Sequence, residues 1–179
     1  MLKIIKTKLE GVVIVKTTQF KDQRGWFTES FNQKIFKFSK IKNFVQDNIS
    51  YNSKIYTIRG LHFQNKPYQQ AKLIRVDQGA ILDLILDLRS NSKTYLQMIT
   101  IKLDDQNNKQ IFIPKGLAHG FLTLRPNTKV FYKVDQYYSK KHDVGINIFD
   151  PKIKITGFNK VKFHLSTRDK NLPFLHEKN

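Results

Sequence analysis

The sequence predicts a mainly β fold, either a sandwich or a barrel of short antiparallel strands. Apolar and polar residues alternate with a period of two along most of the chain. The alternating runs are rich in β-branched and aromatic residues, and Gly, Asn, Asp or Pro turns separate them. Many short strands at such spacing are typical of sandwiches and barrels.

The predicted strands follow one another between residues 12 and 138. They are Val12–Lys16, Ile55–Phe63, Lys72–Asp77, Ile81–Leu88, Tyr95–Leu103, Lys109–Ile113, Gly120–Leu124 and Lys129–Tyr138. The clearest alternation is in Ile81–Leu88, where four leucines share one face and Asp83 and Asp87 share the other. This pattern predicts a half-buried strand.

Two further elements complete the prediction. Phe31–Asn43 has apolar residues at helical spacing, which predicts one short helix packed against the sheet. Lys152–Lys162 is basic and weakly patterned, and we expect it to form another strand before a C-terminal turn. Because no linker, internal repeat or low-complexity segment divides the chain, we expect a single domain over residues 1–179.

The net charge of +18 has two interpretations. Clustered Lys and Arg would neutralise phosphates and indicate a nucleic-acid-binding surface. Here 26 Lys and 6 Arg are spread from Lys3 to Lys178, in a chain that is also rich in Ile and Asn. This distribution favours compositional drift with solvated faces, so we expect no nucleic-acid partner.

The absence of cysteine excludes disulfides, thiolate metal sites and a cysteine nucleophile. Residues 1–16 mix Lys3, Lys6, Lys8 and Glu10 with short apolar pairs, so they lack the continuous apolar stretch of a signal peptide or membrane span. We therefore expect a cytoplasmic protein without a membrane partner.

The segment Arg59–Gln64 places a guanidinium and an imidazole three residues apart, at Arg59 and His62. On a regular strand this odd spacing directs the two side chains to opposite faces. Gly60 permits a bulge that would bring them to one face. Taken alone, the segment favours an exposed Arg and a hydrogen-bonded His on a barrel strand.

The segment Ile113–Phe121 carries Pro-x-Gly-x-x-His and resembles the second half of the cupin barrel signature. In metal-binding cupins the first half supplies His-x-His and a later Glu, because a divalent ion needs three or more protein ligands. This chain offers only His62-Phe63-Gln64 there, so two ligands are missing. We therefore predict no metal site, and His119 alone would be a structural histidine.

A set of strings along nearly the whole chain resembles, in the same order, the pattern of dTDP-4-dehydrorhamnose 3,5-epimerases. The strings are Asp22–Glu29, Phe44–Ser50, Arg59–Gln64, Lys72, Ile113–Phe121, Phe131–Lys133, Tyr137–Tyr138 and Leu165–Asp169. Each string alone is weakly specific, whereas their joint order is highly specific.

This resemblance implies a cupin-type antiparallel β-barrel (jelly roll) with a few short helices, no cofactor and a homodimer that exchanges N-terminal strands. It implies epimerisation at C3 and C5 of dTDP-4-dehydro-6-deoxy-D-glucose, which gives the L-sugar precursor of rhamnose for surface polysaccharide. A single-site 3- or 5-epimerase on a related dTDP-4-keto sugar is the alternative within the family. A non-catalytic basic barrel that binds nucleic acid or anionic polysaccharide is the alternative from another class.

The resemblance also assigns four catalytic residues. His62 is the base, which suits an imidazole because it titrates near working pH. Asp169 would fix its tautomer and stabilise the imidazolium. Lys72 would stabilise the enolate oxygen, and Tyr132 would return a proton to the face opposite the histidine.

Nine residues are implied around the nucleotide, where Arg suits a diphosphate and amides or an aromatic face suit thymine. They are Arg24, Glu29, Gln46, Asn48, Arg59, His119, Tyr138, Asp143 and Arg168. Arg24 and Glu29 would complete the partner's site through strand exchange. Asp143 stands where the family normally has Glu, which shortens the reach toward the ligand.

Overall fold

The computed structural model describes residues 2–34, 36, 43–153, 155 and 161–175. Its strands are β1 (Lys3–Lys6), β2 (Val13–Lys16), β3 (Phe20–Asp22), β4 (Gly25–Phe27), β5 (Gln46–Asn52), β6 (Ile58–Gln64), β7 (Lys72–Gln78), β8 (Ala80–Asp87), β9 (Met98–Asp104), β10 (Lys109–Ile113), β11 (Leu117–Thr123), β12 (Thr128–Val134) and β13 (Asp143–Gly145). One short helix, α1 (Thr167–Lys170), is described near the C-terminus.

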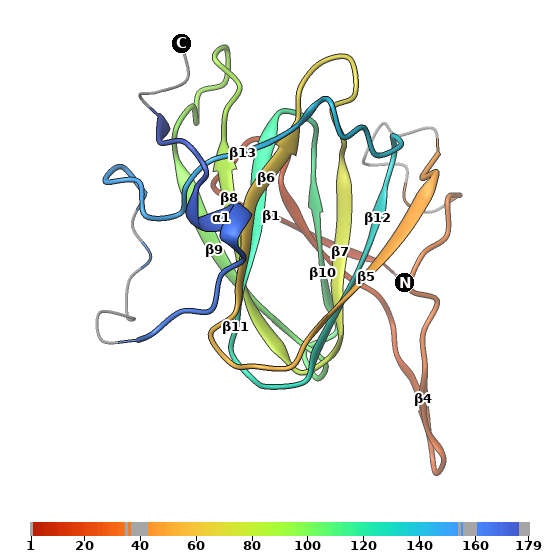
Figure 1. Cartoon of the computed structure of the whole chain (residues 1–179). Helices are drawn as coiled ribbons and strands as arrows, with labels where there is room; N and C mark the ends of the chain where they lie inside the picture. Colours follow the sequence, from red (N-terminus) through yellow and green to blue (C-terminus); the bar gives the residue numbers. More distant parts are fainter. Residues whose placement is uncertain (1, 35, 37–42, 154, 156–160, 176–179) are drawn as a thin grey trace.

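Two antiparallel sheets face each other, as Figure 1 shows. One has six strands in the order β1-β2-β10-β7-β12-β5, and the other has five in the order β13-β6-β11-β8-β9. Strands β3 and β4 form a separate two-stranded ribbon that extends away from both sheets (Figure 1). This arrangement confirms the predicted mainly β jelly roll.

Three apolar clusters stabilise the sheets. The first lies between them and includes Ile74 and Ile111 of the six-stranded sheet and Ile81 and Ile85 of the five-stranded sheet. The second covers the outer side of the five-stranded sheet with the C-terminal segment. In the third, Phe31, Phe36 and Phe44 pack against the outer side of the six-stranded sheet. Burial of this apolar surface is the main driving force for folding.

The prediction for Ile81–Leu88 was wrong in one respect. The strand forms as β8, but it is buried on both faces, and Asp83 and Asp87 are fully buried. Ile81 and Ile85 share a strand face with Asp83 and Asp87, and both isoleucines belong to the cluster between the sheets. The two aspartates therefore face the barrel interior. Asp87 accepts several hydrogen bonds there, which offset the free-energy cost of burying its charge, whereas Asp83 bonds only to His119 through Oδ1 and its Oδ2 has no partner among the described residues.

Several other boundaries differ from the prediction. Of the predicted helix, residues 35 and 37–42 lie outside the described residues, and the described remainder forms no helix. Of the predicted strand Lys152–Lys162, residues 154 and 156–160 also lie outside them, and the described ones are not in a strand. Residues 135–138 lie beyond the end of β12, and backbone groups of residues 136–138 bond to glutamine side chains instead of a neighbouring strand. Strands β1, β3, β4, β5 and β13 were not predicted.

Candidate active site

A cavity of about 540 Å³ opens between the two sheets. It is lined by strands of both sheets and by residues in and next to α1, which lies over β6 (Figure 1). Eleven of the thirteen predicted site residues line it: His62, Tyr132, Asp169, Lys72, Gln46, Asn48, Arg59, His119, Tyr138, Asp143 and Arg168. Most residues that the resemblance implies as site residues therefore lie around one cavity.

A bulge in β6 places Arg59 and His62 in the same cavity. His62 pairs with His119 of β11 and Arg59 pairs with Phe121, so two residues of β6 oppose the single Gly120. Gly60 has a φ of +114°, and a Cβ there would lie 2.6 Å from the Gly120 Cα. Only glycine fits this position, and the bulge that Gly60 was expected to permit is present.

His62 and Asp169 form a dyad although they are far apart in the sequence. Asp169 belongs to α1, whose first turn is capped by Ser166, and the Asp169 N–H donates to Ser166 Oγ at 3.0 Å. Asp169 Oδ1 lies 2.7 Å from His62 Nε2. A carboxylate accepts, so Nε2 carries the proton and Nδ1 is left as the basic nitrogen.

The carboxylate of Asp169 is buried but ionised. Burial raises the pKa of Asp169. The hydrogen bond and charge of His62, together with the bonds from Gly60 and Ser166, lower it by more, so the net pKa is below its usual value. A carboxylate held in this way stabilises an imidazolium when His62 takes up a proton.

Lys72 begins β7 and is almost fully buried. Burial lowers the pKa of its ammonium to about 8, although the charges of Asp143 and Asp83 oppose this shift. Within the part of the chain that the structure describes, Lys72 Nζ makes no hydrogen bond or ion pair. Its donors are therefore available to an oxygen atom inside the cavity.

Tyr132 reaches the cavity from the six-stranded sheet, whereas His62 reaches it from the five-stranded sheet. Burial raises the pKa of the Tyr132 phenol, with the charge of Arg59 lowering it and that of Asp143 raising it. The phenol therefore stays protonated at neutral pH. A protonated phenol and an imidazole thus line opposite walls of one cavity.

A second histidine–aspartate pair lies beside the first. His119 Nε2 is 2.8 Å from Asp83 Oδ1, and both side chains are buried. Burial lowers the pKa of His119, although the charge and hydrogen bond of Asp83 raise it, so the net shift is downward. Asp83 was missed as a site residue, since its place in an alternating run indicated a solvent-facing side chain.

A group at the rim connects three elements. Asp143 Oδ2 accepts from Arg168 Nη1 at 2.7 Å and from the Tyr138 hydroxyl at 3.1 Å. It lies on β13, while Arg168 lies in α1 and Tyr138 in the segment after β12. Despite its short side chain, Asp143 therefore reaches two other predicted site residues.

Arg24 and Glu29 do not line this cavity. Arg24 lies between β3 and β4 and forms an ion pair with Asp22 in the same ribbon. Glu29 follows the ribbon and accepts from Asn32 Nδ2. Within the described chain, Arg24 and Glu29 therefore lie apart from the eleven predicted site residues that line the cavity.

Seven lining residues were not predicted. They are Ser50, Phe63, Gln64, Gln70, Gly120, Phe121 and Ser166. The alternation in Gln46–Asn52 was the available signal for Ser50, because it continues the face of Gln46 and Asn48. No comparable signal marks Gln70, which lies in the connection before β7.

The described residues include neither a cluster of metal ligands nor a helix that could span a membrane. No three His, Asp or Glu side chains among them converge in a way that could hold a metal ion. In the same part of the chain, no helix has the length and apolar character needed to cross a membrane.

Comparisons with known proteins agree over nearly the whole chain. The sequence model of the dTDP-4-dehydrorhamnose 3,5-epimerase family matches residues 6–177. A dTDP-4-dehydrorhamnose 3,5-epimerase from Sinorhizobium fredii is 40% identical over 167 residues, which are 93% of this chain and 86% of that protein.

Two solved structures are also similar. The crystal structure of dTDP-4-dehydrorhamnose 3,5-epimerase from Bacillus anthracis, with TDP and PPi bound, is 45% identical with a TM-score of 0.93 and covers 98% of this chain and 100% of its own. A second crystal structure is that of dTDP-6-deoxy-D-glucose-3,5-epimerase from Legionella pneumophila in complex with dTDP-4-keto-L-rhamnose. It is 32% identical with a TM-score of 0.94, and the match covers 100% of this chain and 95% of that one.

Proposed function

The chain belongs to the dTDP-4-dehydrorhamnose 3,5-epimerase family, and we propose that His62 and Tyr132 carry out its proton transfers. The reaction is the epimerisation of dTDP-4-dehydro-6-deoxy-D-glucose at C3 and C5 to dTDP-4-dehydro-L-rhamnose, a step of dTDP-L-rhamnose biosynthesis. One arrangement supports the assignment of residues: an imidazole with a buried carboxylate behind it lines one wall, and a protonated phenol lines the opposite wall.

Each inversion needs one proton removed and another returned. The C4 ketone acidifies the neighbouring C–H groups. His62 Nδ1 takes a proton, the electrons of the broken C–H bond move to the ketone oxygen, and Asp169 stabilises the imidazolium. The Lys72 ammonium donates to the enolate oxygen as its charge develops. Tyr132 then gives its hydroxyl proton to the other face of the carbon, and exchange with water restores both residues.

The remaining lining residues support a nucleotide site at the same cavity. Arg59 and Arg168 provide guanidinium groups for the diphosphate. Gln46, Asn48, His119, Tyr138 and Asp143 supply amide, imidazole, aromatic and carboxylate groups around it. This assignment predicts that dTDP alone binds and that it protects the cavity from solvent.

A homodimer that exchanges N-terminal strands would bring Arg24 and Glu29 to the partner's cavity. The ribbon supports this proposal, because its apolar side chains are poorly covered: Phe20 is 60% exposed, Trp26 57% and Phe27 69%. Exposed apolar groups that lie close together are typical of protein–protein contacts.

Mixing two inactive variants tests the exchange. A His62→Asn chain can supply Arg24, and an Arg24→Ala chain can supply His62. If Arg24 acts in the partner's cavity, remixed chains regain roughly a quarter of wild-type activity, since half of the dimers are mixed and each has one intact site. If Arg24 acts in its own chain, mixing restores nothing.

Heavy water separates the double epimerase from the single-site alternative. When enzyme and substrate are incubated in deuterium oxide, NMR should show loss of the hydrogen signal at both C3 and C5. Exchange at one carbon alone would favour a 3- or 5-epimerase, and exchange at neither would refute the enzymatic assignment. The cytoplasmic location and the absence of nucleic-acid and membrane partners stay predictions from the sequence.

A further inference from the structure

Residues 136–139, here called the tyrosine loop, are held by glutamine side chains rather than by a strand ladder. Gln70 Nε2 donates to the Gln136 carbonyl at 2.8 Å, and Gln64 Nε2 donates to the Tyr137 carbonyl at 3.1 Å. Gln46 Oε1 accepts from the Tyr138 N–H at 3.1 Å. Gln64 Oε1 accepts from the Ser139 N–H at 2.6 Å. Four consecutive residues thus each bond through their backbone to one of three glutamines that line the cavity.

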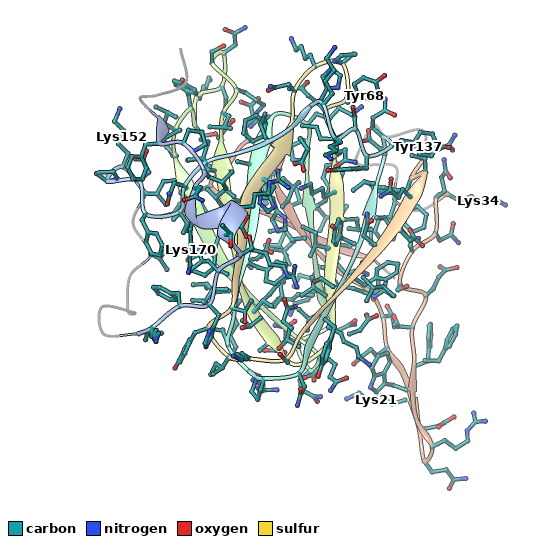
Figure 2. All side chains as sticks on the ribbon, in the orientation of Figure 1. Lys21, Lys34, Tyr68, Tyr137, Lys152 and Lys170 are labelled. Atoms are coloured by element: carbon teal, nitrogen blue, oxygen red, sulfur yellow. The ribbon has the colours of Figure 1, made fainter. Side chains whose placement is uncertain are left out.

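Gln64 makes the largest contribution to this arrangement. Its amide also donates to the Tyr68 carbonyl at 2.6 Å, so it joins the loop after β6 to the tyrosine loop. Figure 2 shows Tyr68 and Tyr137 at the same end of the barrel. Both amide hydrogens and the amide oxygen are used, and the side chain is only 4% exposed. The orientation of the amide is therefore fixed, because a flipped amide would place its oxygen against two carbonyls.

The two bonds to the tyrosine loop flank Tyr138 on both sides. Tyr138 itself is 54% exposed, so little packing restrains its ring. Its hydroxyl bonds to Asp143, which pairs directly with Gln64 across β6 and β13. The position of the ring therefore depends on its backbone, and the backbone depends on Gln64.

We propose that Gln64 is a positioning residue that holds Tyr138 at the mouth of the cavity in the conformation that receives the nucleotide. The inference rests on the proposed assignment of Tyr138 to the nucleotide. Holding the ring in place before binding lowers the entropy cost of ordering it with the ligand. Gln64 lies where metal-binding cupins have the second histidine of their His-x-His pair. In this chain the residue at that position orders a loop.

The test compares dTDP binding in single and double variants. Gln64→Met keeps the length of the side chain and removes its three hydrogen bonds. We expect it to raise the Kd for dTDP about tenfold, as Tyr138→Ala does, because each lost bond contributes modestly and the loop loses its fixed position. In Tyr138→Ala, adding Gln64→Met should raise the Kd no further, since residues that act through one another are not additive.

Turnover and amide exchange distinguish positioning from general destabilisation. Gln64→Met should raise the KM of the epimerisation and leave its kcat within about twofold of wild type. The Ser139 amide should exchange its hydrogen at least about tenfold faster without any ligand. Thr128→Val is the matched control: at the start of β12 it removes the bonds of the Thr128 hydroxyl to the Arg125 carbonyl and the Ala80 N–H, away from the cavity, and it should leave the dTDP Kd unchanged.

Gln64→Glu provides a second variant if Gln64→Met fails to fold. It keeps the acceptor for Ser139 but loses both donors, and it should also raise the dTDP Kd. Independent, multiplying effects of the Gln64 and Tyr138 substitutions would overturn the inference. So would an unchanged Kd in the folded Gln64 variants, even while Tyr138→Ala binds dTDP weakly. If Tyr138→Ala itself binds dTDP normally, the assignment of Tyr138 to the nucleotide fails as well. Deuterium exchange at C3 and C5 by the wild-type enzyme tests the epimerase activity separately.

Discussion

Replacing Asp169 with asparagine removes the negative charge behind His62 and leaves the shape of the side chain almost unchanged. His62 Nε2 and Asp169 Oδ1 are 2.7 Å apart, and the two side chains are 29% and 5% exposed. The imidazolium that forms when His62 takes a proton would therefore lose its counter-charge in a mostly buried place. We expect proton abstraction to slow strongly while substrate binding changes little.

The size of the effect follows from the distance. Two unit charges about 4 Å apart attract each other by about 4 kcal/mol at an effective dielectric constant of 20. The partial exposure of His62 lowers this value to about 3 kcal/mol, and the asparagine amide still forms a neutral hydrogen bond. A loss of about 3 kcal/mol in transition-state stabilisation corresponds to about a hundredfold lower kcat. If the amide instead donates to Nε2, the tautomer reverses and the loss is larger.

The assay follows deuterium uptake into the substrate at saturating concentration, with unfolding measured in parallel. Asp150→Asn is the matched control, because Asp150 is a buried carboxylate that accepts from the Lys152 and Leu175 amides and does not line the cavity. It should change stability and leave the exchange rate intact. A folded Asp169→Asn enzyme with wild-type exchange would refute the role of the dyad.

Two further predictions concern buried charges. The wild-type rate should fall as pH rises through about 8, because the Lys72 ammonium loses its proton there. Lys72→Met should lower kcat about a hundredfold and remove this alkaline limb from the pH–rate profile. An alkaline limb that persists in the variant would contradict the assignment. Burial raises the pKa of Asp87, but hydrogen bonds from Arg89, Ser92 and Thr94 lower it well below its usual value. Asp87 therefore stabilises the fold above pH about 4, and this stability is lost as pH falls. Asp87→Asn should lower the free energy of unfolding at pH 7 by about 3 kcal/mol and flatten its acid dependence in urea titrations; an unchanged acid dependence would contradict this reasoning.

The sequence predicted most strands, because alternation and turn residues are local signals, whereas the cavity residues on them were implied by the resemblance to a known family. It also showed that a bulge at Gly60 was possible, and the structure has this bulge, which brings Arg59 and His62 to one cavity. The burial of Asp83 could not be predicted in this way. A period of two shows which side chains share a face, but the pairing of distant strands decides which face lies inside the barrel.

Long-range side-chain bonds were also beyond the sequence. Gln64 and Tyr137 are 73 positions apart, and His62 and Asp169 are 107 apart. Nothing local to either residue marks such a contact. The dyad was expected only because the sequence resembles a known family, whereas the glutamine contacts with the tyrosine loop required the structure.

The most direct test of the central claim compares His62→Asn with Tyr132→Phe in deuterium oxide, with NMR at C3 and C5. The account predicts no exchange at either carbon in His62→Asn, because the base is gone. It predicts residual exchange in Tyr132→Phe at the carbon that is deprotonated first, because abstraction remains while the proton donor for the opposite face is lost. Wild-type exchange at both carbons in the folded His62→Asn enzyme would contradict the account.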